Sequence, residues 1–324
     1  MPPPIMRNRH LSARLGGAFL LLLTAGSASA QSSGAGPFTV AETGAHFRSL
    51  GDAVDAIGGR DGTILIAPGT YRQCAVQEAG AIVYRAAQPG TVTFDGDICE
   101  GKAALVLRGR AAVIEGLAFR NMRSQEDGNG AGIRLEKGDL TVNGSLFADS
   151  EEGILTHDDP AATIRIDHST FRRLGRCDRG LSCAHSIYIG HYGRLIVTRS
   201  RFEAGSGGHY VKTRSARVDI TDNSFDDSQG HLTNYMIDLS NGSSGLIAGN
   251  IMVQGRDKDN HSAFITVAPE GRDQDSSQLV VRNNRAAFVP GLVRQSTFLA
   301  NWTDDAVTIA DNDLASGVKL KDRR

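Results

Sequence analysis

The densest group of side chains able to do chemistry lies between residues 185 and 240. The segment 208–214 reads GHYVKTR and brings His209, Lys212 and Arg214 close together. If this segment is a strand, Lys212 and Arg214 point to the same side, because side chains alternate along a strand. The other members of the group are His185, Tyr188, His191, Tyr210, Tyr235 and Asp238. We expect these six residues to flank or bind a substrate, with Tyr188 also a catalytic candidate.

These residue types suit β-elimination on a uronic acid. A cation must neutralise the substrate carboxylate, so that the neighbouring C5 proton becomes acidic, and a base must remove that proton. Arg214 is the expected carboxylate partner, because its planar fork matches a carboxylate. Lys212 is the expected base. His209, His185 or Tyr188 could serve instead as base or leaving-group acid, although we expect both histidines to point inward or toward the rim.

A purely structural interpretation of the same residues stays open. Lys212 and Asp238 would then form a cross-strand ion pair worth a few tenths of a kcal/mol. A neighbouring arginine lowers a lysine pKa and a neighbouring carboxylate raises it, so the two effects on Lys212 oppose each other. A groove walled by residues 172–185 would favour an enzyme, and a flat sheet with Lys212 paired to Asp238 would favour a binding protein.

A repeated motif predicts the scaffold that holds these residues. The motif is an alternating apolar strand, two turn residues, Ser or Asn, one further residue and usually Phe; its clear copies end at Phe147, Phe171, Phe202 and Phe225. Weaker copies are centred on Leu117, Asn250, Asn284 and Asn312. The spacing is about 28 residues, and a period of 20–50 residues indicates a solenoid. The alternation of apolar and polar residues indicates strands.

A second strand upstream of each motif implies three short strands per turn of the solenoid, here called a rung. We expect about ten rungs stacked at ~4.8 Å, forming an all-β parallel β-helix. Aligning Ile187, Val211, Ile237 and Ile265 as inward residues places Tyr188, Lys212, Asp238 and Thr266 in one outward column. Asn223, Asn250, Asn284 and Asn312 are expected at a turn, where Asn tolerates the left-handed conformation and can bond along the stack.

The ends of a solenoid need covers, because an open end exposes core and strand edge. Phe47, Leu50, Val54 and Ile57 have helical spacing, which predicts an amphipathic capping helix over residues 46–58. Trp302 and a polar tail over residues 311–324 are expected at the other end. Residues 31–324 would then form a single domain.

Residues 1–30 are typical of a secretory signal peptide. Three arginines without an acid precede an apolar run of about ten residues, which is shorter than a membrane span, and the segment closes on Ala28-Ser29-Ala30. We expect a secreted or periplasmic protein without a membrane segment after cleavage. In that compartment disulfides persist. Four cysteines allow three pairings; we favour Cys74–Cys99, which are about one rung apart, and Cys177–Cys183.

The chain resembles the right-handed parallel β-helix proteins of the pectate-lyase-like superfamily. The resemblance rests on the repeat and on the opening, an amphipathic helix followed by GTILIAPGTY at residues 62–71. It implies a right-handed helix and, for the outward column, a polysaccharide-binding face. The fold hosts lyases, hydrolases, epimerases, tail spikes and adhesins, so it does not select an activity.

Several signatures of this superfamily are missing. Only Gly208-His209 remains of the polygalacturonase-like motifs, and the pectate-lyase Arg-x-Pro-x-x-Arg is absent. Residues 164–168 (IRIDH) resemble a pectate-lyase stretch, but other rungs share the pattern, so we interpret it as scaffold. Paired acids such as Glu151-Glu152 are either solvated or hold Ca²⁺; no other metal or cofactor is expected.

The expected function is a carbohydrate-active protein, most simply a lyase that cleaves a uronate polysaccharide. A non-catalytic polysaccharide-binding or surface β-helix is the alternative, and so is a glycoside hydrolase or a C5-epimerase on the same face. The partner would be an acidic polysaccharide. With 35 basic and 36 acidic residues the chain lacks the basic excess of a nucleic-acid binder. We expect a monomer.

Overall fold

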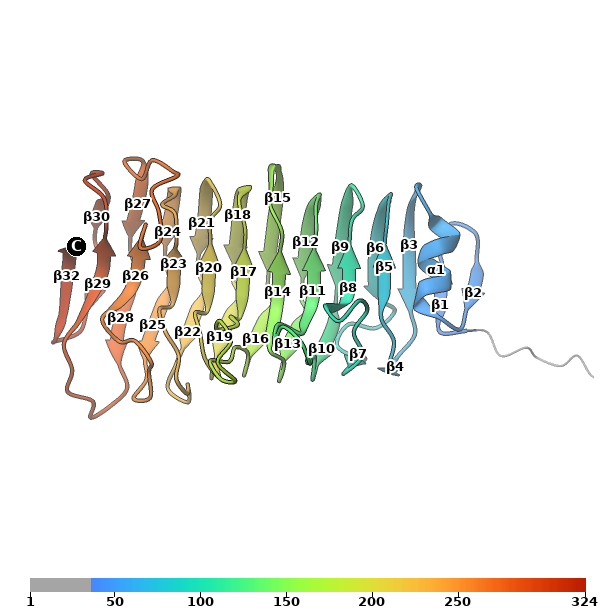
Figure 1. Cartoon of the computed structure of the whole chain (residues 1–324), viewed down its shortest axis with the longest axis horizontal. Coiled ribbons are helices and arrows are strands. Elements are labelled where there is room, and N and C mark those ends of the chain that lie inside the picture. The colour runs from blue at the N-terminus through green and yellow to red at the C-terminus, as the bar shows by residue number, and fades with distance from the viewer. Residues whose placement is uncertain (1–35) are drawn as a thin grey trace, which may run out of the picture. The chain divides into compact units, whose positions relative to one another are not determined.

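The computed structural model describes residues 36–324, which form a stack of rungs built from three long sheets (Figure 1). The two sheets of ten strands are parallel throughout, and the sheet of twelve is parallel except for its first two strands. Each rung contributes one strand to each sheet. The predicted parallel β-helix of about ten three-strand rungs is confirmed.

The sheet of twelve, here sheet A, begins with the antiparallel strands β2 (Ala45–Phe47) and β1 (Phe38–Val40). It continues through β3 (Asp61–Ile66), β6 (Ala81–Ala86), β9 (Ala111–Glu115), β12 (Asp139–Asn143), β15 (Asp159–Asp167), β18 (Tyr192–Thr198), β21 (Arg217–Thr221), β24 (Ser244–Ala248), β27 (Leu279–Arg282) and β30 (Thr308–Ala310).

Sheet B contains β4 (Gly69–Tyr71), β7 (Val92–Asp95), β10 (Leu117–Arg120), β13 (Leu146–Ala148), β16 (Thr170–Arg172), β19 (Arg201–Glu203), β22 (Ser224–Asp226), β25 (Ile251–Gln254), β28 (Arg285–Phe288) and β31 (Asp313–Leu314). Sheet C contains β5 (Ala75–Gln77), β8 (Ala103–Leu107), β11 (Ala131–Leu135), β14 (Glu152–Thr156), β17 (Ile187–Ile189), β20 (Val211–Thr213), β23 (Ile237–Leu239), β26 (Ala263–Val267), β29 (Ser296–Asn301) and β32 (Val318–Arg323).

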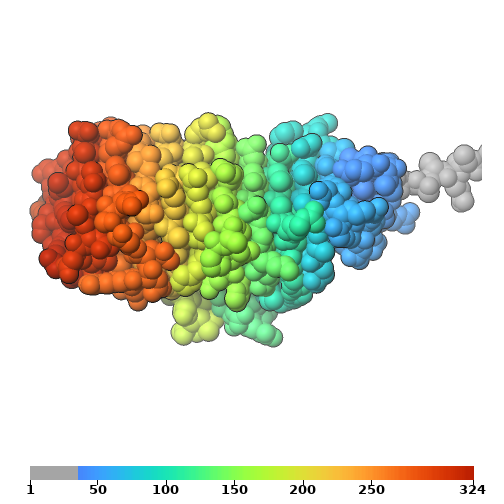
Figure 2. All heavy atoms as spheres, turned by 90° about the horizontal axis from the view of Figure 1, so that it is seen from above, coloured from blue at the N-terminus to red at the C-terminus, as the bar shows by residue number. Residues whose placement is uncertain are grey.

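The repeated phenylalanine forms a continuous stack inside the solenoid. Phe94, Phe119, Phe147, Phe171, Phe202 and Phe225 are fully buried, and the rings of neighbouring rungs lie 4.8 to 5.6 Å apart. This spacing follows the strand spacing, because equivalent residues of parallel strands sit one above the other. In Figure 2 the colours follow one another in bands along the stack, as expected when each rung packs on its neighbour.

The asparagine turn also behaves as predicted, with one difference. The side-chain oxygen of Asn250 accepts the backbone N–H of Asn223 at 3.0 Å, and Asn284 and Asn312 continue the same ladder. The left-handed conformation, however, belongs to the preceding residue, for example Asp222 (φ 59°) and Asn283 (φ 55°). The buried Asn stays extended enough to face its neighbour, and the exposed residue before it makes the turn.

The N-terminal cover is a helix shorter than the one predicted. Helix α1 (Leu50–Ile57) starts after Ser49, whose side-chain oxygen accepts the backbone N–H of Asp52. Its apolar side, including Leu50, Val54 and Ile57, is buried against the first strands. The predicted start at residue 46 is wrong, because Ala45–Phe47 pairs with β1 as strand β2.

The C-terminal end also differs from the prediction of a polar tail. Residues 313–323 mostly form strands β31 and β32, which pair with β28 and β29 and close the last rung. The guanidinium of Arg324 lies 5.2 Å from the ring centre of Trp302. Polar residues are compatible with strands here because only one face of these last strands covers the core.

Both predicted disulfides, Cys74–Cys99 and Cys177–Cys183, are present. The predicted signal peptide, residues 1–30, lies outside the described residues. Within residues 36–324, no helix is long and apolar enough to cross a bilayer.

Candidate functional site

The outer face of sheet C carries the residues singled out from the sequence. Its register pairs Ile187 with Val211, Val211 with Ile237 and Ile237 with Ile265, as aligned from the sequence. Tyr188, Lys212, Asp238 and Thr266 therefore form one column of outward side chains. Two rungs earlier the same column contains Arg134, separated from Tyr188 by Leu155.

A hollow of ≈ 380 Å³ opens over part of this face. We call it the Tyr188 hollow. Tyr188, Arg134 and Glu152 lie in its lining, together with Arg214 and His191. Ser182 and Cys183 of the disulfide loop and Asn129 of the preceding rung's loop line it as well. Residues 172–185 thus contribute a wall, as an enzyme would require.

Tyr188 is held by a cation at the edge of the hollow. The Nε of Arg214 donates a hydrogen bond to the phenol oxygen of Tyr188 at 3.0 Å. Lys212 Nζ lies 5.3 Å from the centre of the same ring.

Arg214 is less free than expected for a carboxylate clamp. Besides Tyr188 it contacts the side chains of Asn241 and Glu270. Burial lowers its pKa, but the bonds to Tyr188 and Glu270 outweigh this effect and raise it. Arg214 is therefore a fixed cation that positions Tyr188.

Two residues that the sequence analysis did not select, Arg134 and Glu152, bring unused polar atoms to the hollow. Arg134 Nε and Glu152 Oε1 are buried and have no hydrogen-bond partner among residues 36–324. Arg134 also forms an ion pair, because its Nε lies 3.4 Å from Glu136 Oε1, and its positive charge acts on Glu152 as well. Rung alignment could have found Arg134, because it shares the column of Tyr188.

Glu152 is a buried carboxyl group with only 1% of its surface exposed. Burial raises its pKa well above the usual value, and the nearby Arg134 opposes this effect only in part. A raised pKa favours the protonated carboxyl group, which is the form that can donate a proton. The sequence carries no signal for the burial of Glu152, because the loop that covers it comes 30 residues later in the chain and is placed only by the tertiary structure.

His191 lies at the rim of the hollow between two carboxylates. Its Nδ1 is 3.2 Å from Asp158 and its Nε2 is 3.4 Å from Asp273. Burial raises the pKa of Asp158, but the hydrogen bond from the His191 backbone, together with its ring, lowers it overall. His191 thus links the rim to the loop around residue 273.

Lys212, the expected base, is buried and paired. Only 5% of its surface is exposed, and its Nζ lies 3.2 Å from Asp238 and also contacts Glu270. Asp238 in turn accepts hydrogen bonds from Ser240 and Thr266. The ion pair that the structural interpretation required is present.

His185, His209 and Tyr235 form a second outward column, stacked ring on ring. The ring centres are 5.0 Å apart between His185 and His209, and 5.3 Å apart between His209 and Tyr235. The Nδ1 atoms of both histidines accept backbone N–H groups of the next rung, so the ring proton sits on Nε2. Burial, reinforced by neighbouring positive charge, lowers the pKa of both histidines. They are neutral spacers rather than exposed bases.

Tyr210 does not belong to the outer face. It is buried in the core, and its hydroxyl donates to Asp227 at 2.7 Å. Sheet C places two successive residues inward at this point, Tyr210 and Val211, so simple alternation fails there. The structure therefore separates Tyr210 from the predicted substrate-binding residues.

The acid pairs do not converge on a common point. Among the described residues, no group of three or more His, Cys, Asp or Glu side chains is arranged to hold a metal ion. Glu151 and Glu152, for example, line different hollows.

Comparisons with known proteins agree with the fold. The family model described as "Right handed beta helix region" matches residues 102–254. ORF18 of Geobacillus virus E2 superposes with a TM-score of 0.52 at 14% identity, covering 84% of this chain and 57% of that one. This chain thus spans little more than half the length of the viral protein. No curated protein sequence matches.

Two further structures show weaker similarity. The pectin methylesterase of Aspergillus niger has a TM-score of 0.44 at 14% identity, with 89% of each chain covered. The Streptococcus pneumoniae surface protein and adhesin PfbA has a TM-score of 0.33 at 11% identity, covering 84% of this chain and 94% of the adhesin. At such identities the similarity concerns the fold alone.

Proposed function

We propose that this chain, a right-handed parallel β-helix protein, binds an acidic polysaccharide in the Tyr188 hollow and cleaves it by β-elimination. The observation that carries the proposal is the pairing of Tyr188 with Arg214 at 3.0 Å, beside the unused guanidinium donor of Arg134. A base and a cation on one face are the two requirements of uronate elimination.

Each residue has a defined part in this reaction. Arg134 binds the uronate carboxylate and neutralises it. The phenolate form of Tyr188 takes the C5 proton; the electron pair forms the C4–C5 double bond as the bond from C4 to the leaving oxygen breaks. That oxygen takes a proton from the neutral carboxyl of Glu152 or back from Tyr188. Arg134 and Tyr188 are two rungs apart, about 10 Å, a separation that their long side chains span around one sugar.

The geometry supports hydrolysis less well. Glycosidases hold two carboxyl groups about 5 to 9.5 Å apart. Glu152 opens β14 (Glu152–Thr156), and Asp158 follows that strand by two residues. The four residue steps of the strand alone span about 13 Å, which does not match the carboxyl separation of that mechanism.

Non-catalytic binding is the second candidate. It is favoured by the ion pair of Lys212 with Asp238, which engages the expected lysine base. Arg134 would still bind a carboxylate in this case, and Tyr188 would serve as a stacking surface for a sugar.

A panel of uronate polysaccharides tests the proposal, with and without Ca²⁺. Cleavage is measured by the ultraviolet absorbance of the unsaturated product, with reducing ends counted in parallel. We expect the parent to produce absorbance and Tyr188→Phe to lose at least about 100-fold of the rate while still binding. Binding without absorbance would support the binding protein, and reducing ends without absorbance would support hydrolysis. Lys319→Ala, an exposed change far along the stack, is the control.

Secretion belongs to the same proposal. All four cysteines are paired in disulfides, which persist outside the cytoplasm. A protein with a polysaccharide substrate must also meet that substrate outside the cell.

A further inference from the structure

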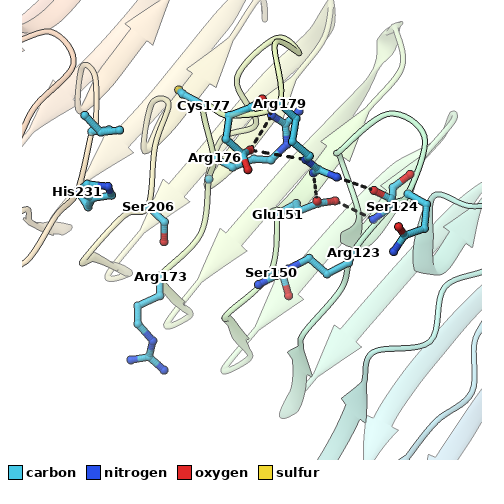
Figure 3. A pocket seen from close by; sticks show the side chains of 14 residues that line it. Arg123, Ser124, Ser150, Glu151, Arg173, Arg176, Cys177, Arg179, Ser206 and His231 are labelled. Atoms are coloured by element: carbon cyan, nitrogen blue, oxygen red, sulfur yellow. Dashed lines mark hydrogen bonds and ion pairs between the residues drawn. The ribbon is translucent and has the colours of Figure 1, made fainter.

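A second hollow lies beside the disulfide loop (Figure 3). Its volume is ≈ 490 Å³, and we call it the arginine hollow because Arg123, Arg173, Arg176 and Arg179 line it. It sits where the chain passes from sheet B to sheet C. Cys177 of the disulfide loop faces it, whereas Cys183 faces the Tyr188 hollow. One short loop therefore separates the two hollows.

Two of the lining residues, Glu151 and Arg176, connect the loops that form the walls of the hollow. The carboxylate of Glu151 accepts the backbone N–H groups of Ser124 and Gly130 at 2.7 and 2.8 Å, and it also pairs with Arg179 (Figure 3). Arg176, 8% exposed, donates to the carbonyl oxygens of Gly128 and Ser182. These contacts join the loop at residues 121–130 to the disulfide loop, so the hollow is formed before any ligand binds.

The remaining arginines keep donors for a ligand. The one hydrogen bond that the guanidinium of Arg123 makes within residues 36–324 goes to the carbonyl oxygen of Met122 at 2.9 Å. Arg173 is paired with Asp149 through Nε and Nη2, which leaves Nη1. The lining contains four arginines and two carboxylates, those of Glu151 and Asp178; with Asp149, which pairs with Arg173, the arginines still outnumber the carboxylates by one.

We infer that the arginine hollow is a second subsite, which binds the carboxylate of a uronate unit away from the point of cleavage. The planar fork of arginine matches a carboxylate in two parallel hydrogen bonds. Pockets of about 300 to 1,000 Å³ hold small-molecule ligands, so the hollow has room for a sugar unit. This inference takes its ligand class from the proposed function, but it does not require cleavage.

Calorimetric titration with tri-galacturonate tests the inference, with maltotriose as the neutral probe. To isolate the second hollow, the titration is made in the Arg134→Gln background, where the first hollow has lost the cation of Arg134. We expect tri-galacturonate to bind, maltotriose not to bind, and the further change Arg123→Gln with Arg173→Gln to weaken binding at least tenfold. Arg172→Gln, an arginine of the same segment outside this hollow, should leave binding unchanged.

The failure of the inference is separable from the failure of the proposed function. If the Arg123 and Arg173 changes leave tri-galacturonate binding intact, or if maltotriose binds equally well, the second subsite is refuted even when Tyr188→Phe abolishes cleavage. If the chain binds sulfate ions at least as tightly as tri-galacturonate, and sulfate displaces the sugar, the hollow is a general anion site. The inference is then also overturned.

Discussion

Glu151 and Glu152 are neighbours in the sequence, yet their carboxyl groups line two different hollows on either side of one disulfide loop. Glu151 is hydrogen-bonded to two backbone amides and to Arg179, whereas Glu152 keeps an oxygen without a partner. The first holds loops together, and the second faces the proposed reaction. Glu151 immediately precedes β14 and Glu152 is its first residue, so one strand start supplies both sites.

Lys212→Met should destabilise the protein more than it changes chemistry. The change leaves Asp238 buried, at 1% exposure, without its cation. Breaking a buried pair costs about 3 to 5 kcal/mol, which urea unfolding measures. The double change with Asp238→Asn should recover part of this loss. A Lys212 variant that stays as stable as the parent but loses all activity would instead return Lys212 to a catalytic role.

Stability should fall in mild acid because of the histidine column. Burial lowers the pKa of His185 and His209 in the folded state. Below the pKa of about 6.5 that histidine has in the unfolded chain, the unfolded chain binds protons that the folded chain does not bind. The full stability is therefore present above that pH, and the free energy of unfolding falls as the pH drops below it. Each histidine contributes up to about 1.4 kcal/mol per pH unit. His209→Asn, whose amide can still accept the Tyr235 N–H, should flatten urea-unfolding profiles between about pH 5 and 7.

The control for this experiment is His46→Asn, because His46 is exposed near the N-terminal end. Its profile should follow that of the parent. An unchanged acid dependence in His209→Asn would show that the stacked histidines are not its source.

Glu152→Gln should stabilise the protein at mildly alkaline pH. Burial raises the pKa of Glu152 in the folded state, so its contribution to stability is present below the unfolded value of about 4.5 and is lost as pH rises toward the folded value. Glutamine stays neutral in the folded and the unfolded state, so the Glu152→Gln variant does not lose this stability as the pH rises. The stability gain over the parent should therefore grow with pH above about 4.5, in thermal or urea unfolding. Equal stability at every pH would contradict a neutral Glu152.

The two disulfides should have different effects when removed. The separation of Cys74 and Cys99 is 25 residues, and that of Cys177 and Cys183 is 6. Loop entropy predicts a loss of roughly 3.5 kcal/mol for the first and roughly 2.2 kcal/mol for the second. Paired Cys→Ser variants measure this by urea unfolding. Only the loss of Cys177–Cys183 should weaken tri-galacturonate binding, because that loop walls both hollows; equal weakening by both variants would argue against this role of the loop.

The sequence alone determined the scaffold. The repeat predicted the rungs, the register of Ile187 with Val211 and Ile237, both disulfides and the asparagine ladder. This was possible because strand alternation and a fixed repeat are local patterns, and stacking turns each repeated position into a column in space.

Only the tertiary structure decided which outward side chains are open to a ligand. Lys212 is covered by Glu270, 58 residues further along the chain, while Arg134 and Glu152 gain their hollow from a loop of a later rung. The loops between rungs carry no period, so the sequence pattern does not place them. Outward-facing and exposed are different properties in a solenoid: alternation sets the first, and the packing of distant loops sets the second.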